Sequence, residues 1–358
     1  MKPTTKLHDI GQSLWLDDIT RDMLDSGTLA RAIAELSVTG LTSNPSIFDH
    51  AISHSDKYDR EIGELQARGF TAEALFFELA FSDLRRAADL FLPVHTRTAG
   101  VDGWVSLEVS PLLAYDTNAT TAEARRLSTR AAKPNLFVKI PGTREGLPAI
   151  EASIAAGMPI NVTLLFSPAQ YEATADAYMK GLEARIAKGQ APDVPSVASV
   201  FISRWDRAVI EKVPEAMHNT LGIAIAKLCY QSYRKVLASD RWQRLANLGA
   251  RAQRLLFAST GTKDPKASDI LYITALAAPN TINTMPQATL RAFADHGSVE
   301  KILSPDPGDA ADVLAAHEKA GIDVAKLADQ LQMDGAKAFV ASWKDLLKTI
   351  EAKSRVLA

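Results

Sequence analysis

The chain has 358 residues, of which 47% are hydrophobic and 23% are charged, a composition typical of a globular protein with a large buried core. Forty Lys and Arg residues stand against forty-two Asp and Glu residues, which gives a formal net charge of −2. This balance excludes an overall positive field that would hold nucleic acid or an anionic membrane, so any recognition of phosphate must be local.

A single cysteine, Cys229, excludes internal disulfides and a Cys-rich metal site, and it fits a reducing compartment. Its setting in IAIAKLCYQSY predicts a packed helix residue and not a reactive thiol. The N-terminal segment lacks the apolar stretch of a signal peptide, and no apolar run reaches the roughly 18 residues of a membrane span. We therefore expect a cytoplasmic protein that binds neither membrane nor nucleic acid.

Short apolar segments alternate with longer segments of helical periodicity from one end of the chain to the other. The helical segments include TAEALFFELAFSDLRRAADLFL and SPAQYEATADAYMKGLEARIAK, whose apolar residues recur every three or four positions. The last part of the chain, from about 307 to 358, has no strand signal and predicts two or three further helices. The predicted strands, in chain order, are 13–17, 40–44, 104–110, 135–140, 160–166, 197–202, 254–259 and 280–284.

An order of strand then helix, repeated about eight times, predicts parallel βα units. Eight units without a break in composition favour an α/β fold of the closed (β/α)8 or TIM barrel type, with additional C-terminal helices. The alternative is an open doubly wound sheet, but the first predicted strand is not followed by the Gly-rich loop of its nucleotide-binding forms. With no linker and no low-complexity tract, residues 1–358 are expected to form one domain.

Successive residues of a strand point to opposite sides of the sheet, so each predicted strand can be divided into two faces. The more aliphatic face should contact the helices, and the face with polar groups should point to the barrel axis near the C-terminal strand ends, where barrel active sites lie. In 160–166 this division places Val162, Leu164 and Phe166 on the helix side. The residues assigned to the axis are Trp15, Asp17, Thr42, Asn44, Ser106, Glu108, Phe137, Lys139, Asn161, Thr163, Leu165, Ser199, Phe201 and Ser259.

Lys139 interrupts the apolar segment NLFVKI and is the most informative of these residues. An ammonium group inside an apolar barrel loses hydration, which lowers its pKa. The unprotonated amine attacks a carbonyl and forms a Schiff base, the electron sink needed to break or make a bond beside a ketone. Asp17 and Glu108 supply carboxyl groups for the proton transfers, and Thr163 is placed to order a water between them. The axis face therefore predicts a Schiff-base lyase or transferase.

Two structural explanations of the same residues stay open. A lysine near a strand end can extend its ammonium group to water while its methylene chain stays buried. Glu108 and Asp17 can be ion-pair partners of Lys139 with no chemical role.

Two segments are candidates for binding an anionic group of the substrate. Arg204 follows the sixth predicted strand in FISRWDR, and ASTGTKDPK follows the seventh. Loops after the seventh and eighth strands of a barrel often bind phosphate. Ser259, Gly261 and Lys263 offer a hydroxyl, a close backbone approach and a positive charge there. The loop lacks Walker spacing, so an ordinary turn is the alternative.

Eight short motifs stand in a characteristic order along the chain: WLDD (15–18), TSNPS (42–46), SLEVSP (106–111), NLFVKIPGT (135–143), INVTLLFS (160–167), SVFISRWD (199–206), ASTGTK (258–263) and NTMP (283–286). With them the chain resembles the transaldolases over nearly its whole length. The resemblance implies a class I, Schiff-base enzyme of the non-oxidative pentose phosphate pathway that needs no cofactor and no metal. Such an enzyme transfers a dihydroxyacetone unit from sedoheptulose 7-phosphate or fructose 6-phosphate to an aldose phosphate, glyceraldehyde 3-phosphate or erythrose 4-phosphate.

The resemblance also implies a role for each matching residue. Lys139 would be the nucleophile, and Glu108 and Thr163 would handle the catalytic water. Asp17 would be the acid/base at the hydroxyl whose proton starts cleavage. The residues expected to bind substrate are Thr42, Asn44, Asn161, Ser199 and Phe201 around the dihydroxyacetone unit, and Arg204, Ser259 and Lys263 at the phosphate.

Two features depart from the shorter transaldolases. Those have an arginine shortly after the serine that matches Ser259, whereas this chain has STGTK, so Lys263 is assigned the second phosphate charge. A long insertion, residues 229–253, precedes the seventh predicted strand. Both features are similar to a longer bacterial subgroup and to the transaldolase half of fusions with phosphoglucose isomerase.

Several alternatives are weighed against this function. The related fructose 6-phosphate aldolases have a tyrosine at the position of Phe201, so the phenylalanine favours transfer over an aldolase-type lyase. Lys139 as an anchor of pyridoxal phosphate and a non-catalytic barrel scaffold are the other two. His50 and His54 have the spacing of metal ligands, but their surroundings predict a solvated helix. The expected partners are sugar phosphates, and the protein is expected to be a monomer or a homodimer.

Overall fold

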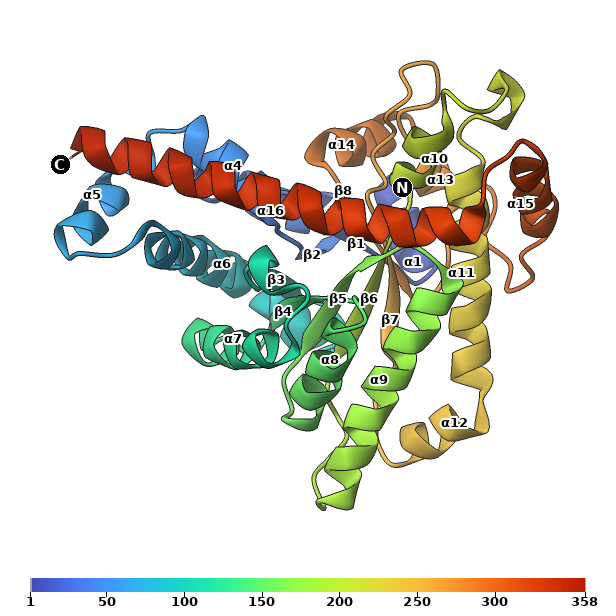
Figure 1. The fold of residues 1–358 in the computed structure, drawn as a ribbon, viewed down its shortest axis with the longest axis horizontal. Coiled ribbons are helices and arrows are strands. Elements are labelled where there is room, and N and C mark those ends of the chain that lie inside the picture. Colours follow the sequence, from blue (N-terminus) through green and yellow to red (C-terminus); the bar gives the residue numbers. More distant parts are fainter. Residues whose placement is uncertain (1, 358) are drawn as a thin grey trace.

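The computed structural model describes residues 2–357 and contains a closed barrel of parallel strands (Figure 1). Neighbouring strands pair in chain order, and β1 pairs with β8 to close the barrel. The prediction of a (β/α)8 barrel is therefore confirmed. The strands are β1 (Gln12–Leu16), β2 (Val38–Leu41), β3 (Trp104–Glu108), β4 (Leu136–Pro141), β5 (Ile160–Leu165), β6 (Ser196–Phe201), β7 (Arg254–Ala258) and β8 (Thr281–Met285).

Helices surround this barrel on the outside and cover one of its ends (Figure 1). Only Arg254 among the strand residues is not buried, since the strands lie between the side chains of the axis and those of the helices. The helices are α1 (Pro3–Asp9), α2 (Arg21–Asp25), α3 (Thr28–Glu35), α4 (Pro45–Ser53), α5 (Asp59–Ala67), α6 (Ala72–Arg97), α7 (Thr117–Ala131), α8 (Gly146–Ala155), α9 (Pro168–Ala187), α10 (Ser203–Val209), α11 (Leu221–Ala238), α12 (Asp240–Asn247), α13 (Leu271–Ala275), α14 (Gln287–His296), α15 (Ala310–Lys319) and α16 (Val324–Leu357), with short 3₁₀ helices at Pro111–Leu113 and Glu215–Met217.

Two helices begin directly after strand ends and use the same local signal. Asn44 accepts a hydrogen bond from the Ile47 amide at 3.1 Å and caps α4, and Ser167 caps α9 through the Gln170 amide at 3.2 Å. Each cap is followed by a proline at the first helical position, where no backbone donor is needed. The chain thus turns sharply at the C-terminal strand ends, which leaves these ends open to form a site.

The end of β5 corrects one part of the predicted strand faces. Leu164 has φ of 61°, a left-handed conformation that leucine seldom adopts, and the register with β6 shifts between Val162 and Leu165. Leu165 consequently pairs with Val200 and lies beside Gly142 on the helix side, and Phe166 packs with its ring 5.4 Å from that of Phe201. The assignment of Leu165 to the axis and Phe166 to the helices is wrong, because the bulge exchanges the two faces.

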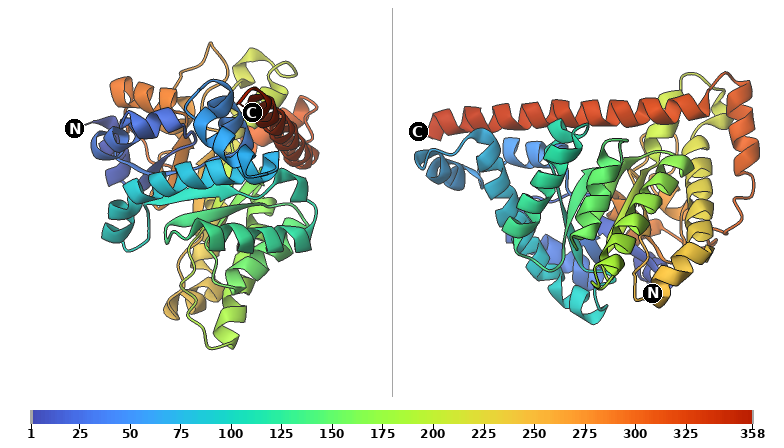
Figure 2. Two further views of the ribbon diagram at one scale, coloured as in Figure 1. Left: turned by 90° about the vertical axis from the view of Figure 1, so that its left-hand side faces the viewer. Right: turned by 60° about the horizontal axis from the view of Figure 1, so that its bottom comes forward.

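The two helices α15 and α16 follow the last strand and its helix α14, as predicted for the C-terminal part. α16 runs straight across the end of the barrel where the strands finish, while the N-terminus lies at the opposite end (Figure 2). Its side chains contribute to the same cluster of buried apolar residues as those of β1 and α6, and on this ground we propose a single domain. Among the described residues, no helix is both long enough and apolar enough to cross a membrane.

Candidate active site

A small cavity of about 120 Å³ lies at the C-terminal ends of the strands, where the barrel fold places its functional side chains. It is partly enclosed by α16, which supplies Phe339. The residues that line it are Asp17, Thr42, Asn44, Lys139, Thr163, Ser199, Phe201, Arg204, Ala258, Ser259, Thr284 and Phe339. Nine of these were singled out from the sequence, so the structure brings together residues separated by more than two hundred positions.

Lys139 and Glu108 form a buried ion pair beneath this cavity. Nζ of Lys139 lies 3.2 Å from Oε2 of Glu108 and donates a hydrogen bond of 3.0 Å to the carbonyl of Ser43. The side chains of Lys139 and Glu108 are only 6% and 4% exposed. Extension of the ammonium group to bulk water is therefore wrong as an explanation of this lysine. The expected ion pair of Lys139 with Glu108 is present. Because Lys139 also lines the cavity, its amine can contact a molecule bound there.

Glu108 is a carboxyl group with a raised pKa. Burial away from water raises the pKa of Glu108, and the positive charge of Lys139 opposes this effect. Within residues 2–357, neither Oε1 of Glu108 nor the hydroxyl of Thr163 has a hydrogen-bond partner, although both atoms are buried. Buried polar atoms are normally paired, so these two are available to a molecule that enters the cavity.

Asn161 lies one layer below the cavity and acts on it through Ser199. The Ser199 hydroxyl donates to Oδ1 of Asn161 at 2.8 Å, and Nδ2 of Asn161 donates to the hydroxyl of Ser106 at 3.1 Å. This chain of hydrogen bonds crosses from β6 to β3 through the barrel axis. It fixes the position of the Ser199 hydroxyl at the cavity wall.

Asp17 follows the end of β1 and lines the same cavity as Lys139. Burial raises its pKa to about 7, with a further contribution from the negative charge of Asp18, while Lys263 and Lys139 oppose the shift. A carboxyl group with this pKa gains and loses a proton near neutral pH. It therefore has the property required of a general acid/base.

Arg204 is a cation without an ion-pair partner in the described part of the chain. Its guanidinium group lies 5.0 Å from the ring centre of Phe201 and 5.8 Å from that of Phe339, distances typical of cation–π contacts. Among the described residues it makes no hydrogen bond and no ion pair with any other side chain. Ser259, whose hydroxyl is hydrogen-bonded to that of Ser203 at 2.9 Å, lines the same cavity. An unpaired guanidinium beside a hydroxyl is suited to bind a phosphate group.

Lys263 lies outside this cavity. It lines a neighbouring space of about 370 Å³ together with Ser203, Arg207, Asn219 and Tyr272 among others. Its charge still reaches the cavity, since it lowers the pKa of Asp17. The assignment of Lys263 to the phosphate stays a prediction. Lys263 would have to act on the phosphate from outside the cavity that Arg204 lines.

Comparisons with known proteins fit this arrangement. A family model described as "Transaldolase/Fructose-6-phosphate aldolase" matches residues 14–350. The chain belongs to this family. A protein called "Transaldolase" from Parafrankia sp. (strain EAN1pec) is 45% identical over 98% of this chain and 97% of its own length. A "Transaldolase" from Thermobifida fusca (strain YX) is also 45% identical, over 97% of both chains, and a "Transaldolase 2" from Nostoc punctiforme is 40% identical over 99% of this chain and 98% of its own.

The structure of this transaldolase-family enzyme adds residues that the sequence did not single out. The Ser43 carbonyl accepts the hydrogen bond from Lys139, and Thr284 lies 3.4 Å from Thr42 between their hydroxyl oxygens. Both lie in quoted motifs, so a rule that examined every polar residue of those motifs would have found them. Phe339 had no such signal, because it lies in an amphipathic helix far from every motif.

A larger cavity, of about 630 Å³, lies at the other end of the barrel among the N-terminal strand ends. Its charged groups are engaged with protein atoms: Arg254 bonds to Ser13 and to the carbonyls of Val101 and Thr281, and Arg251 bonds to Asp193. Size alone would favour this cavity. The unpaired polar groups favour the smaller one as the active site of this family member.

Proposed function

We propose that the chain is a transaldolase that transfers a dihydroxyacetone unit between ketose phosphates and aldose phosphates through a Schiff base on Lys139. One observation carries this proposal: Lys139, which is paired with the buried Glu108, lines the same cavity as Arg204, whose guanidinium group has no ion-pair partner among residues 2–357. The first group suits a ketone and the second suits a phosphate. A sugar phosphate with a ketone at one end has both.

In the first half of the reaction, Lys139 must become a free amine. Proton transfer from Lys139 to Glu108 produces it and leaves a neutral carboxylic acid, a form that the raised pKa of Glu108 favours. The amine attacks the C2 carbonyl and forms a carbinolamine. Glu108 then returns a proton to the departing hydroxyl, with the Thr163 hydroxyl ordering the water that leaves, and a protonated Schiff base remains.

In the second half, Asp17 acts on the sugar hydroxyl at C4. Its carboxylate removes that proton, the C3–C4 bond breaks, and the bonding electrons move into the Schiff base to give an enamine. The shortened aldose phosphate leaves with its new aldehyde. An acceptor aldose phosphate reverses these steps, and water finally releases the ketose product from Lys139. The hydroxyls of the three-carbon unit fit the polar groups of Asn44 and Ser199, with Asn161 holding Ser199 in place and Thr42 nearby.

Phosphate recognition is assigned to Arg204 and Ser259, with Lys263 as a more distant charge. Arg204 combines a fixed charge with unused donors, which is the property that a bidentate phosphate contact requires. The substrates expected on this basis are sedoheptulose 7-phosphate, fructose 6-phosphate, erythrose 4-phosphate and glyceraldehyde 3-phosphate. A cytoplasmic location and a monomeric or homodimeric state stay predictions that accompany this function.

The second candidate is an aldolase that releases free dihydroxyacetone. Phe201 supports transfer over release, since it lines the cavity with an apolar ring that offers no hydroxyl to protonate the enamine. A coupled assay of fructose 6-phosphate with and without erythrose 4-phosphate separates the two functions. A transaldolase forms glyceraldehyde 3-phosphate rapidly only with the acceptor present, whereas equal rates in both assays identify an aldolase.

The nucleophile is tested by chemical trapping. Borohydride with fructose 6-phosphate is expected to add a reduced dihydroxyacetone unit to the peptide that contains Lys139. Lys139→Ala should abolish the adduct, and Lys133→Ala, at an ion-paired surface lysine, should leave it unchanged. An adduct on another lysine contradicts the mechanism, and the absence of any adduct favours a non-catalytic scaffold.

A further inference from the structure

Three residues of α16 lie on the side of this helix that faces the barrel. Gln332, Gly335 and Phe339 are spaced by three and four positions, so they share one face of the helix. All three contact the ends of strands or the site itself. The face of α16 that carries Gln332, Gly335 and Phe339 therefore makes specific contacts with the C-terminal strand ends of the barrel and with Arg204.

Gln332 fixes the position of α16 relative to the strands of the site. Its Nε2 donates to the carbonyl of Gly142 at 3.0 Å and to that of Leu164 at 2.9 Å. Gly142 follows β4, which carries Lys139, and Leu164 belongs to β5, which carries Thr163. One side-chain amide thus joins the last helix to the two strands that hold the proposed nucleophile and its hydroxyl neighbour.

Gly335 brings the helix backbone close to Arg204. A Cβ at this position would lie 3.2 Å from Nη1 of Arg204 and 2.9 Å from Cδ2 of Leu164. Both distances are too short for the side chains to keep their places. A side chain at residue 335 would therefore shift the guanidinium from its observed position.

Phe339 completes the surroundings of the guanidinium one turn further along α16. Its ring centre lies 5.8 Å from the guanidinium carbon of Arg204, and the Phe201 ring lies at 5.0 Å. Phe339 is only 4% exposed, so the ring is held by packing. Because Arg204 has no hydrogen-bond acceptor among residues 2–357, aromatic contacts of this kind are what define its orientation.

We propose that Phe339 is a positioning residue that orients Arg204 for the phosphate of the substrate, and that Gly335 leaves the space for it. The inference rests on the proposed function for the identity of the anion as a sugar phosphate. According to this proposal, residues on the strands carry out the covalent chemistry, and residues on α16 determine the strength of phosphate binding.

The test compares two probes, one with and one without the anion. Orthophosphate is measured by its binding constant, and unphosphorylated dihydroxyacetone by the rate of borohydride trapping on Lys139. Phe339→Ala is expected to weaken orthophosphate binding about five- to thirtyfold, the range of a desolvated cation–π contact, with dihydroxyacetone trapping unchanged. For fructose 6-phosphate, KM should rise by a similar factor while kcat changes less than about twofold.

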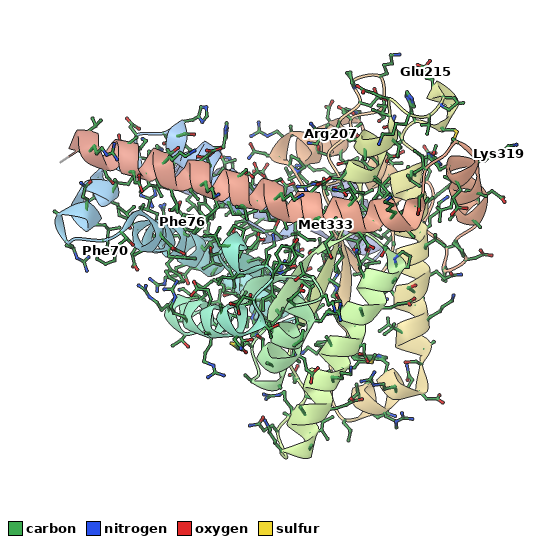
Figure 3. The ribbon with its side chains drawn as sticks, viewed as in Figure 1. Phe70, Phe76, Arg207, Glu215, Lys319 and Met333 are labelled. Atoms are coloured by element: carbon green, nitrogen blue, oxygen red, sulfur yellow. The ribbon has the colours of Figure 1, made fainter. Side chains whose placement is uncertain are left out.

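Four further variants keep the result interpretable. Phe339→Leu retains most of the volume without the ring and should weaken orthophosphate binding, whereas Phe339→Tyr should restore it. Gly335→Ala should weaken it without opening a hole in the core. Met333→Ala, an exposed position on the same helix (Figure 3), should have no effect.

Each result separates this proposal from the proposed function. Orthophosphate binding that is unchanged in Phe339→Ala and Phe339→Leu overturns the role of Phe339. Loss of dihydroxyacetone trapping in parallel with orthophosphate binding also overturns it, because the ring then supports the site as a whole. A wild-type protein that binds orthophosphate through Arg204 and is trapped by no ketone would overturn the proposed function and leave the role of Phe339 standing.

Discussion

Glu108 and Lys139 occupy paired positions on the neighbouring strands β3 and β4, and this register places their charged atoms 3.2 Å apart. Both side chains come from the axis face of their strands, so the register of β3 and β4 brings them to the same level of the barrel. A buried pair of this kind is costly to form and costly to break. In the proposed mechanism, a proton passes from Lys139 to Glu108 across this distance.

Replacement of Glu108 by glutamine should act on turnover and not on phosphate binding. The amide keeps the shape but neither donates nor accepts the proton that Lys139 must lose, so kcat should fall roughly 10²- to 10⁴-fold. Steady-state kinetics and orthophosphate binding measure the two effects separately. Thr163→Val, which removes only the hydroxyl, should give a smaller loss of kcat, and equal losses of turnover and orthophosphate binding in Glu108→Gln would indicate a structural Glu108.

Asp17 should give the reaction a dependence on pH near neutrality. Since the pKa of Asp17 is raised to about 7, the carboxylate that removes the C4 proton forms as pH rises through this value, and cleavage should accelerate with it. The pH profile of kcat/KM measures this group in the free enzyme. Asp17→Asn should be slow at every pH, and a wild-type profile that is flat between pH 6 and pH 8 (roughly one unit on either side of the raised value) contradicts the assignment.

The Asp17 carboxyl group should lower the stability of the protein as pH rises, whereas it should raise the rate of cleavage. Its folded pKa of about 7 exceeds the ordinary value of 3.8, so the unfolded chain binds fewer protons there and stability falls as pH rises between these values. Above about pH 7, the full destabilisation from the buried charge of Asp17 is present. Urea unfolding should therefore show Asp17→Asn to be more stable than the wild type at about pH 8 and equal to it at about pH 3. Equal stability at both pH values would show that Asp17 is not desolvated.

Arg204 and Lys263 should differ in their contribution to phosphate binding. Arg204→Ala removes a charged donor at the cavity and should raise KM for fructose 6-phosphate roughly 10- to 100-fold. Lys263→Ala removes an exposed charge in the neighbouring space and should raise it less than about fivefold. Kinetics at low and at high salt check this order, because only the contribution of the exposed lysine should be largely screened. The reverse order would place the phosphate beside Lys263.

Gly40 should be sensitive to the smallest enlargement. A Cβ there would lie within 2.6 Å of Cδ2 of Trp15, whose indole nitrogen donates to Asp102 at 2.8 Å and keeps the ring in place. Gly40→Ala should therefore lower the free energy of unfolding by about 1–3 kcal/mol. Gly63→Ala is the matched control: among residues 2–357 its Cβ meets only Leu357, at an ordinary 3.8 Å, and the substitution should stabilise α5 by about 0.4–1 kcal/mol. Chemical denaturation measures both, and an unaffected Gly40→Ala would show that the barrel interior can repack.

The sequence was sufficient to predict the barrel and most of the residues that line the candidate site, because both depend on the two-residue period of strands. The alternation within each predicted strand assigns Glu108, Lys139 and Asn161 to the axis separately, and the observed register pairs Lys139 with both of the others. No long-range information is needed for this step. The closed order of strands supplies the rest.

The bulge in β5 and the contribution of α16 to the site were not predicted, because neither produces a periodic pattern in the sequence. The bulge at Leu164 reverses the faces of Leu165 and Phe166, and nothing in INVTLLF marks a left-handed leucine, since glycine and asparagine are the residues that normally adopt it. Phe339 resembles any core residue of an amphipathic helix, because its neighbour Arg204 is 135 positions away. Contacts between distant segments are set by packing, which a pattern within one segment does not report.

Because α16 is the last element of the chain, its residues are synthesised after all the strands of the barrel. A ribosome makes the chain from its N-terminus, so every strand and Lys139 are present before the first residue of α16 is added. A nascent chain at that stage contains the residues proposed for the covalent chemistry, but it lacks Phe339, whose ring lies 5.8 Å from the Arg204 guanidinium. If Phe339 orients Arg204 as proposed, the ability to bind phosphorylated sugars is the last property that the growing protein acquires.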